Sequence, residues 1–121
     1  MKIAVSSEGP GIDSQMDQRF GRCPYFVLVD TDTMEFESVE NEGAMASGGA
    51  GTSTGMAIAK KGIKAVLTGN CGPKAYSVLN AAGIEVYTGI SGTVKSAVEQ
   101  YKNGGLTGNG GPNVPSHSGN K

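Results

Sequence analysis

The amino-acid sequence predicts an α/β domain built on a mixed five-stranded sheet with flanking helices. Three observations support this fold class. Short runs rich in β-branched and aromatic residues recur five times. Three further segments carry apolar residues at helical spacing, and the segments follow the order β-β-β-α-β-α-β-α. A hairpin followed by right-handed crossovers then gives one sheet, with the second strand antiparallel to the others. This is a ribonuclease H-like topology.

The first half of the chain carries three of the predicted strands. Residues 2–6 form a short apolar run typical of a buried central strand, and a polar loop follows over residues 7–22. Residues 25–30 give the strongest strand pattern because they are rich in aromatic and β-branched residues. Residues 34–40 alternate apolar and charged side chains, as an edge strand does, and a glycine- and alanine-rich loop occupies residues 41–51.

The second half is expected to hold three helices and two strands. Gly62, Gly83 and Gly104 each end a helix. Pro73 suits a first helical position because its missing N–H costs nothing there, and Thr93 suits an N-cap. The expected elements are helices over residues 52–61, 73–82 and 94–103 and strands over residues 64–68 and 84–88.

Length and composition predict one folded domain and a tail. A chain of 121 residues is the size of a single domain. We expect residues 1–106 to form the α/β domain that carries the binding site. Residues 107–121 are mostly Gly, Asn, Pro and Ser, so we expect a disordered tail with little apolar surface to bury.

Charge and hydropathy exclude several classes of partner. The net charge is −1 and aromatic residues make up 6%, so neither a basic surface nor a stacking platform for nucleic acid is expected. No apolar run approaches the ~20 residues that a membrane helix needs. The first predicted strand begins at Lys2, which leaves no room for a signal peptide. We therefore expect a cytoplasmic protein whose two cysteines are thiols.

The predicted topology brings several loops to one edge of the sheet. Ligands of open α/β sheets bind outside the C-terminal ends of the strands. In this fold that edge receives residues 6–22, 23–24, 41–52, 68–73 and 88–93. Both cysteines and both arginines fall in these loops, so we expect the site there.

The two cysteines allow different interpretations. Cys71 precedes a helix that begins at Pro73, where unpaired N–H groups and the helix dipole favour thiolate. Alternatively, Cys71 is a small residue packed in a turn. For Cys23, which opens a strongly apolar strand, a buried packing role is the favoured interpretation.

A conventional metal site is not expected. The cysteines lie 71 − 23 = 48 positions apart, and the single histidine, His117, is in the tail. A closed zinc site needs four protein ligands. A cluster that brings its own sulfides needs fewer, because the protein has only to hold an anion. Arg19, Arg22 and Lys74 supply positive charge for this, with backbone N–H groups of residues 48–51.

Plainer interpretations stay open for the same residues. Residues 48–51 equally suit a flexible connector, and Arg19 and Arg22 could pair with Asp13 and Asp17. Catalysis is disfavoured because the first strand carries no acid for a magnesium site and no histidine is available beside a cysteine. A phosphate-ester hydrolase is the remaining enzymatic alternative.

Three stretches resemble the dinitrogenase iron–molybdenum cofactor family. Residues 19–30 resemble its Phe-Gly-Arg segment, residues 49–55 its glycine-rich loop, and residues 65–89 its block around Asn-Cys-Gly-Pro. The resemblance extends over about residues 1–106. Many members carry a histidine in the loop after the third strand, where this chain reads Glu-Gly-Ala-Met-Ala-Ser-Gly over residues 42–48.

The resemblance implies non-catalytic binding, storage or delivery of an anionic molybdenum-containing sulfide cluster. The missing histidine favours a ligand-poor molybdenum–copper sulfide cluster over an iron–molybdenum cofactor precursor. A protein partner for delivery is also expected. The alternative function is a regulatory or scaffold domain that acts through a protein partner. The expected cofactor-binding residues are Arg19, Phe20, Gly21, Arg22, Cys23, Met45, Ser47, Gly48, Gly49, Gly51, Asn70, Cys71, Gly72 and Lys74, with Cys71 and Cys23 as candidate metal ligands.

Overall fold

The computed structural model describes residues 1–41 and 50–104, with the side chains of all of these except residues 50–53. Within these ranges the chain forms one five-stranded sheet in the order β3-β2-β1-β4-β5. β2 is antiparallel to β1 and β3, whereas β1, β4 and β5 are parallel, so the predicted fold class is confirmed. The elements are β1 (Lys2–Ser7), β2 (Tyr25–Asp30), β3 (Phe36–Glu40), α1 (Ala50–Ala59), β4 (Ala65–Leu67), α2 (Pro73–Ala81), β5 (Glu85–Tyr87) and α3 (Val94–Lys102).

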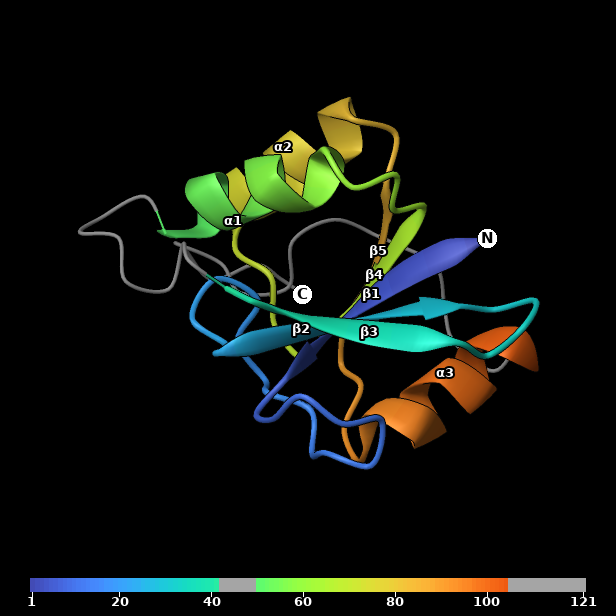
Figure 1. Ribbon diagram of the computed structural model, residues 1–121. Coiled ribbons are helices and arrows are strands. Elements are labelled where there is room, and N and C mark those ends of the chain that lie inside the picture. The colour runs from blue at the N-terminus through green and yellow to red at the C-terminus, as the bar shows by residue number, and fades with distance from the viewer. Residues whose placement is uncertain (42–49, 105–121) are drawn as a thin grey trace.

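Helices cover both faces of the sheet. Figure 1 shows α1 and α2 on one face and α3 on the other. Because side chains alternate along each strand, each face carries its own apolar cluster. The cluster on the α1–α2 side includes Ala4, Phe26, Leu28, Val66 and Leu79. The cluster on the α3 side includes Ile3, Val5, Val27, Val29 and Val98.

The ends of α2 and α3 form as the sequence predicts. Beyond α2, the Gly83 N–H donates to the Asn80 carbonyl at 3.0 Å and the Ile84 N–H donates to the Leu79 carbonyl at 2.9 Å. Gly83 adopts a φ of 80°, which explains why glycine stands at this helix end. At the start of α3, the side chains of Thr93 and Ser96 each accept a hydrogen bond from the other's backbone N–H.

The glycine-rich motif has a packing role at its last position. A Cβ on Gly55 in α1 would lie 3.1 Å from Cγ1 of Val78 in α2. The missing side chain therefore lets the two helices approach closely. This approach fixes α1 against α2 on their face of the sheet.

The bounds of four elements differ most from the sequence-based expectation, those of β3, α1, β4 and β5. β3 begins at Phe36 rather than at residue 34, because the Met34 N–H closes a turn onto the Asp30 carbonyl at 2.7 Å and Met34 adopts a φ of 64°. α1 starts two residues earlier than expected. It also ends two residues earlier, where the Lys61 N–H donates to the Ile58 carbonyl at 3.0 Å. β4 and β5 are each three residues long, shorter than expected.

The strand register defines two edges of the sheet. Ser7, Tyr25 and Glu40 stand side by side on β1, β2 and β3. We call this the loop edge. It carries Asn41 and the loops over residues 8–24, 68–72 and 88–93. The opposite edge carries the shorter connections over residues 31–35, 60–64 and 82–84.

Candidate functional site at the loop edge

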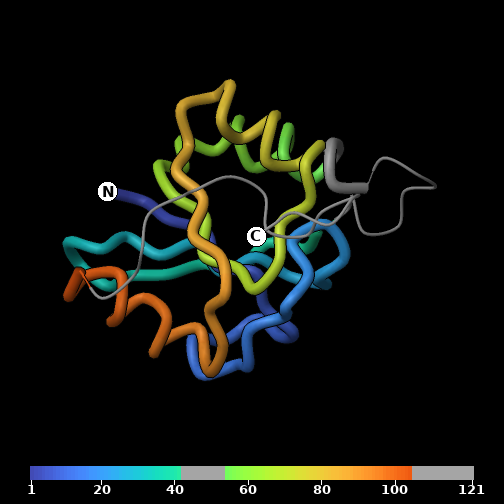
Figure 2. The backbone as a smooth tube through the Cα atoms, turned by 180° about the vertical axis from the view of Figure 1, so that it is seen from behind, coloured from blue at the N-terminus to red at the C-terminus, as the bar shows by residue number. Residues whose placement is uncertain are grey.

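The two cysteine-bearing loops lie against each other at the loop edge. Arg19 and Asn70 form a parallel bridge, and the Phe20 N–H donates to the Asn70 carbonyl at 3.1 Å. Figure 2 shows the same contact from behind, where the blue segment near residue 20 runs beside the yellow-green segment near residue 70. Residues 50 positions apart in sequence are thus brought together, as the predicted topology requires.

Gly69 allows this close approach. A Cβ at Gly69 would lie 2.9 Å from the Gln18 Cα and closer still to the Gln18 side chain. The Gln18 amide also donates to the Ile90 carbonyl at 3.2 Å, which ties the loop after β5 to the same place. Three loops are therefore held at fixed positions, and any residue larger than glycine at position 69 would push them apart.

Asn41 fixes the Gly21–Cys23 segment against α1. Its side-chain amide donates to the Gly21 carbonyl at 3.2 Å and to the Cys23 carbonyl at 2.8 Å. Its side-chain oxygen accepts a hydrogen bond of 2.9 Å from the Thr54 hydroxyl. Asn41 is 7% exposed and Thr54 1%, so these bonds are shielded from water. Such a satisfied buried network holds the loop in one arrangement.

Ser6 makes a similar junction between β1, β4 and the first loop. Its hydroxyl lies 2.7 Å from the Asp17 carbonyl, to which it donates, and 2.8 Å from the Thr68 hydroxyl. All three side chains are buried. The ends of two parallel strands are therefore joined to the loop that leads to Arg19.

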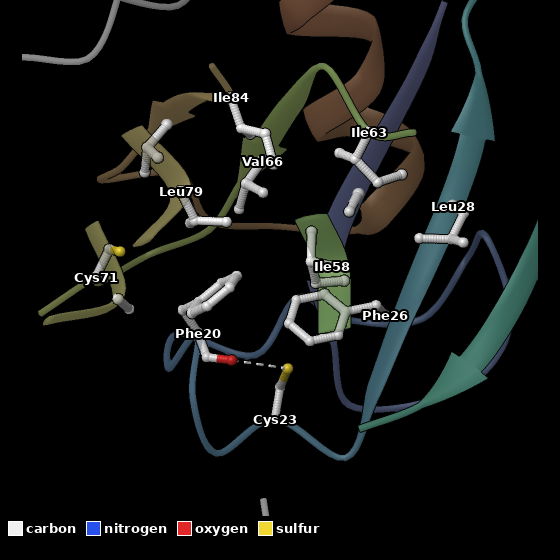
Figure 3. Close-up of a cluster of buried hydrophobic side chains, with 13 residues drawn as sticks. Phe20, Cys23, Phe26, Leu28, Ile58, Ile63, Val66, Cys71, Leu79 and Ile84 are labelled. Atoms are coloured by element: carbon white, nitrogen blue, oxygen red, sulfur yellow. Dashed lines mark hydrogen bonds between the residues drawn. The ribbon is translucent and has the colours of Figure 1, made fainter. Parts of the chain in front are cut away.

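Cys23 lies in the core, as its packing interpretation expects. Its side chain is buried, and its thiol donates to the Phe20 carbonyl at 3.4 Å (Figure 3). Phe20 in turn packs on Phe26, with ring centroids 5.2 Å apart. Burial raises the pKa of the Cys23 thiol to about 12.

Cys71 differs from its thiolate interpretation. It directly precedes the N-cap residue of α2, as expected, but its side chain is only 1% exposed and belongs to the same apolar cluster as Cys23 and Phe20. Figure 3 shows it on the side of Phe20 away from Cys23. Burial raises the pKa of the Cys71 thiol to about 12. Burial therefore disfavours the thiolate that a helix N-terminus would favour.

Arg19 pairs with an acid, as one of the open interpretations proposed. Its guanidinium contacts both carboxylate oxygens of Asp17, at 3.1 and 3.0 Å, and its backbone N–H donates to the same carboxylate at 2.8 Å. Burial would raise the pKa of Asp17, but the hydrogen bonds and charge of Arg19 outweigh it and hold the pKa below its usual value. The partner is Asp17, and this pairing fixes the loop as well as neutralising charge.

The remaining expected site residues fall into two groups. Arg22 and Lys74 are exposed at the loop edge, where Lys74 is the second residue of α2 and follows the N-cap Gly72. Gly51 lies in the first turn of α1. Four expected residues lie outside the described part of the chain: Met45, Ser47, Gly48 and Gly49.

Sequence reasoning missed the polar residues that hold the loops. Asn41, Thr54, Ser6 and Thr68 all lie at or near the ends of elements that converge on the loop edge. Their position could have indicated this role, because a buried polar residue at the end of a strand needs a hydrogen-bond partner. Their partners come from distant parts of the chain, so pairing could not be read from spacing.

Residues 1–41 and 50–104 contain neither a cluster of conventional metal ligands nor a helix suited to a membrane. No group of three or more His, Cys, Asp or Glu side chains in these ranges could hold a metal ion. No helix within them has the length and apolar character required to cross a membrane.

Comparison with known proteins identifies the family. The apo orange protein of Desulfovibrio gigas is 45% identical, with a TM-score of 0.90 over 93% of this chain and 95% of that chain. An NMR structure of a Thermotoga protein is 33% identical, with a TM-score of 0.76 over 88% and 91% of the two chains. An uncharacterized protein of Methanocaldococcus jannaschii is 33% identical over 109 residues, which are 88% of this chain and 89% of that protein. The sequence model described as dinitrogenase iron-molybdenum cofactor matches residues 1–104, and the chain therefore belongs to this family.

Proposed function

We propose that this protein binds, stores or delivers an anionic molybdenum-containing metal–sulfide cluster at the loop edge, without catalysing a reaction. A mixed molybdenum–copper sulfide is the favoured cargo, and an iron–molybdenum cofactor precursor is the alternative. Membership of a family described by a cofactor supports cluster binding as the general function. The similarity to the orange protein supports it as well.

One observation carries the proposal. The Phe-Gly-Arg-Cys and Asn-Cys-Gly-Pro segments, which carry the family resemblance, meet through the Phe20–Asn70 hydrogen bond of 3.1 Å. They do so at the end of the sheet where open α/β proteins bind ligands. Two segments that are distant in sequence are thereby arranged as one surface.

The residues at this surface suit an anion that supplies its own sulfides. Arg22 and Lys74 are exposed and carry positive charge at the loop edge, and Lys74 lies in the first turn of α2. Backbone N–H groups in the first turn of a helix point toward such an anion. Cys23 and Cys71 are candidate ligands, but both thiols are buried beneath this surface. In this proposal charge and N–H groups hold the cluster, and either sulfur would bind only after a local movement of its loop.

The first test is the visible absorption spectrum and metal content of protein purified from its natural source. A carrier is expected to show a sulfide-to-metal charge-transfer band, with molybdenum and acid-labile sulfide bound in proportion to protein. Copper in the same fraction would support the mixed cluster, and iron would support the precursor. A colourless, metal-free preparation that also takes up nothing from thiomolybdate, alone or with copper, would contradict the proposal.

A second test separates surface charge from direct metal bonds. Replacing Arg19 and Arg22 together by Gln removes two positive charges at the loop edge and should weaken cluster retention, more strongly as salt is raised. The matched control replaces the exposed Lys60 and Lys64 by Gln, which removes the same charge at the opposite edge. Equal retention by the two double variants would exclude a local electrostatic site.

The proposed compartment is the cytoplasm. Neither Cys23 nor Cys71 forms a disulfide in the described part of the chain, and a reducing compartment keeps cysteines in the thiol state.

A further inference from the structure

In the part of the chain that the structure describes, the outer side of β3 is an unpaired strand edge. The Asp30 N–H donates to the Glu35 carbonyl at 2.9 Å, and the Asn41 N–H donates to the Pro24 carbonyl at 2.9 Å. In an antiparallel pair, inward and outward backbone groups alternate along the strand. The N–H and C=O groups of Phe36, Ser38 and Glu40 therefore point away from β2. Within residues 1–41 and 50–104, β3 is the last strand on this side of the sheet, at the front of Figure 1.

We propose that β3 receives an extended segment of a partner protein as a sixth strand, and that this segment alternates basic and apolar residues. Strand addition to an exposed edge takes its affinity from main-chain hydrogen bonds and its specificity from alternate side chains. The side chains on the two faces of β3 define that alternation. The inference does not depend on the proposed function, since it concerns a different surface and its test uses protein without cluster.

One face of the β3 edge is acidic. Glu37 is on the same face as its cross-strand partner Leu28, and its side chain is 63% exposed. Asp30 and Glu35 line the same shallow hollow of about 290 Å³. Lys2 contacts Glu37 at 3.8 Å and the N-terminal ammonium group contacts Asp30 at 3.6 Å, so these two cations offset part of the acidic charge. A basic side chain on the incoming strand would lie beside these carboxylates.

On the other face of β3, apolar side chains line the surface beside the strand edge. Phe36 is on the same face as its cross-strand partner Val29, and its side chain is 46% exposed. It lines a hollow of about 650 Å³ between β3 and α3, together with Ile12 and Met34. An apolar side chain on the incoming strand would cover this surface. Lys95, Glu99 and Lys102 of α3 surround the hollow with charge of both signs.

The acidic residues of β3 also favour a strand from a different protein over the β3 strand of a second copy of this chain. Two β3 strands paired edge to edge would bring two sets of Glu35, Glu37 and Glu40 together. Like charges across a strand pair are destabilising, and charged residues on edges block pairing between copies. The same carboxylates attract a basic segment, so charge complementarity selects a partner other than this chain.

The test uses an eight-residue peptide that alternates valine and lysine, added to ¹⁵N-labelled full-length protein. The expected result is saturable binding with chemical-shift changes centred on residues 35–40 and slower hydrogen exchange of the Phe36, Ser38 and Glu40 amides. Two control peptides have the same composition. One places four lysines before four valines, and the other is N-methylated at every residue. Both should bind at least about tenfold more weakly, a loss of ~1.4 kcal/mol.

Three variants complete the test. Ser38→Pro removes one outward N–H and should abolish strand addition, whereas Ser38→Ala keeps that N–H and should bind normally. Glu35→Lys combined with Glu37→Lys should shift the preference to a peptide that alternates valine and glutamate. Equal binding of the N-methylated peptide, or shifts centred away from β3, would overturn the proposal even if Ser38→Pro failed to fold.

Discussion

The loop edge and the opposite edge of this sheet are built from different interactions. Every buried polar or charged side chain in the described residues belongs to the loop edge: Ser6, Ser7, Asp17, Asn41, Thr54 and Thr68. At the opposite edge the buried side chains are apolar, Ile63 and Ile84. Its connections turn through positive φ at Met34, Gly62 and Gly83.

This difference indicates what each edge does. Burying a polar group costs free energy unless it is hydrogen-bonded, so apolar turns would be the simpler way to close a sheet. At the loop edge, polar side chains instead connect segments that are distant in sequence, as Asn41 does for Gly21, Cys23 and Thr54. The loops are thereby held in position before any ligand arrives, which is what a binding surface requires.

The largest expected effect is a difference in thiol reactivity between the buried cysteines of the loop edge and an exposed cysteine introduced elsewhere. Burial raises the pKa of Cys23 and Cys71 from 9.0 to about 12, which leaves roughly a thousandfold less thiolate at pH 8. Alkylation of the folded protein by iodoacetamide should therefore be slower by about a hundredfold or more than in urea. The control is Asn80→Cys in a variant lacking both native cysteines, because position 80 is exposed on α2. Fast alkylation of Cys71 in the folded protein would restore its thiolate interpretation.

The same shifts predict alkaline destabilisation. Because the folded pKa lies above the unfolded value, the stabilising effect of the neutral thiols is complete below about pH 9. It is lost as pH rises toward 12. The free energy of unfolding should thus fall less steeply above pH 9 when Cys23 and Cys71 are both replaced by Ala. Parallel curves for the two proteins would show that the thiols ionise as readily in the folded state as in the unfolded state.

The next largest effect is expected from Asn41→Ala. The substitution removes the side-chain hydrogen bonds of Asn41 to Gly21, Cys23 and Thr54 and leaves the groups of these residues without this partner. We expect a loss of about 3 kcal/mol in the free energy of unfolding, measured by urea denaturation. Asn80→Ala, on the exposed side of α2, is the matched control and should change stability by less than about 0.5 kcal/mol. Similar losses in both variants would remove the distinction between the edges.

A smaller, pH-dependent effect is expected from Asp17→Asn. The variant keeps an acceptor for the Arg19 backbone but loses the charge-assisted pair, so we expect about 1–2 kcal/mol of destabilisation at pH 7. Arg19 lowers the folded pKa of Asp17 below 3.8. The stabilisation is therefore present above about pH 4 and disappears as pH falls through the lower folded value. A difference from wild type that persists unchanged at pH 2 would contradict this origin, and Asp30→Asn at the opposite edge should have less effect at pH 7.

The smallest effect is expected from removing the tail. Residues 107–121 lie outside the described part of the chain, and their composition offers little apolar surface to bury. A chain ending at Leu106 should unfold within about two degrees of the full chain and take up cluster equally well. A clear loss of either property would show that the tail contributes to the domain.

Most of the fold could be predicted because strand and helix patterns are local. The apolar run at residues 25–30 and the Pro73 start of α2 each needed only neighbouring residues to be recognised. The start of β3 could not be predicted, since the turn that delays it depends on Met34 adopting a positive φ, which is rare for a residue with a side chain.

The sequence predicts where the candidate site lies, but not the burial or the hydrogen bonds of its residues. The topology alone brought residues near Arg19 and Asn70 together, as the structure shows. The environment of Cys71 could not be predicted, because its burial at 1% exposure depends on tertiary packing and leaves no signal in the neighbouring residues. Hydrogen bonds such as Asn41–Thr54 depend on tertiary packing and leave no local pattern.

The central claim, that the loop edge is the cluster site, is tested most directly by mapping bound cluster in solution. Amide spectra of ¹⁵N-labelled protein should be compared before and after loading with molybdenum–copper sulfide. We expect shifts or broadening confined to residues 17–24 and 69–75 and to the neighbouring ends of the strands. Residues 31–35, 60–64 and 82–84 of the opposite edge should remain unchanged. Perturbations centred on those turns, or spread evenly over the sheet, would contradict the assignment.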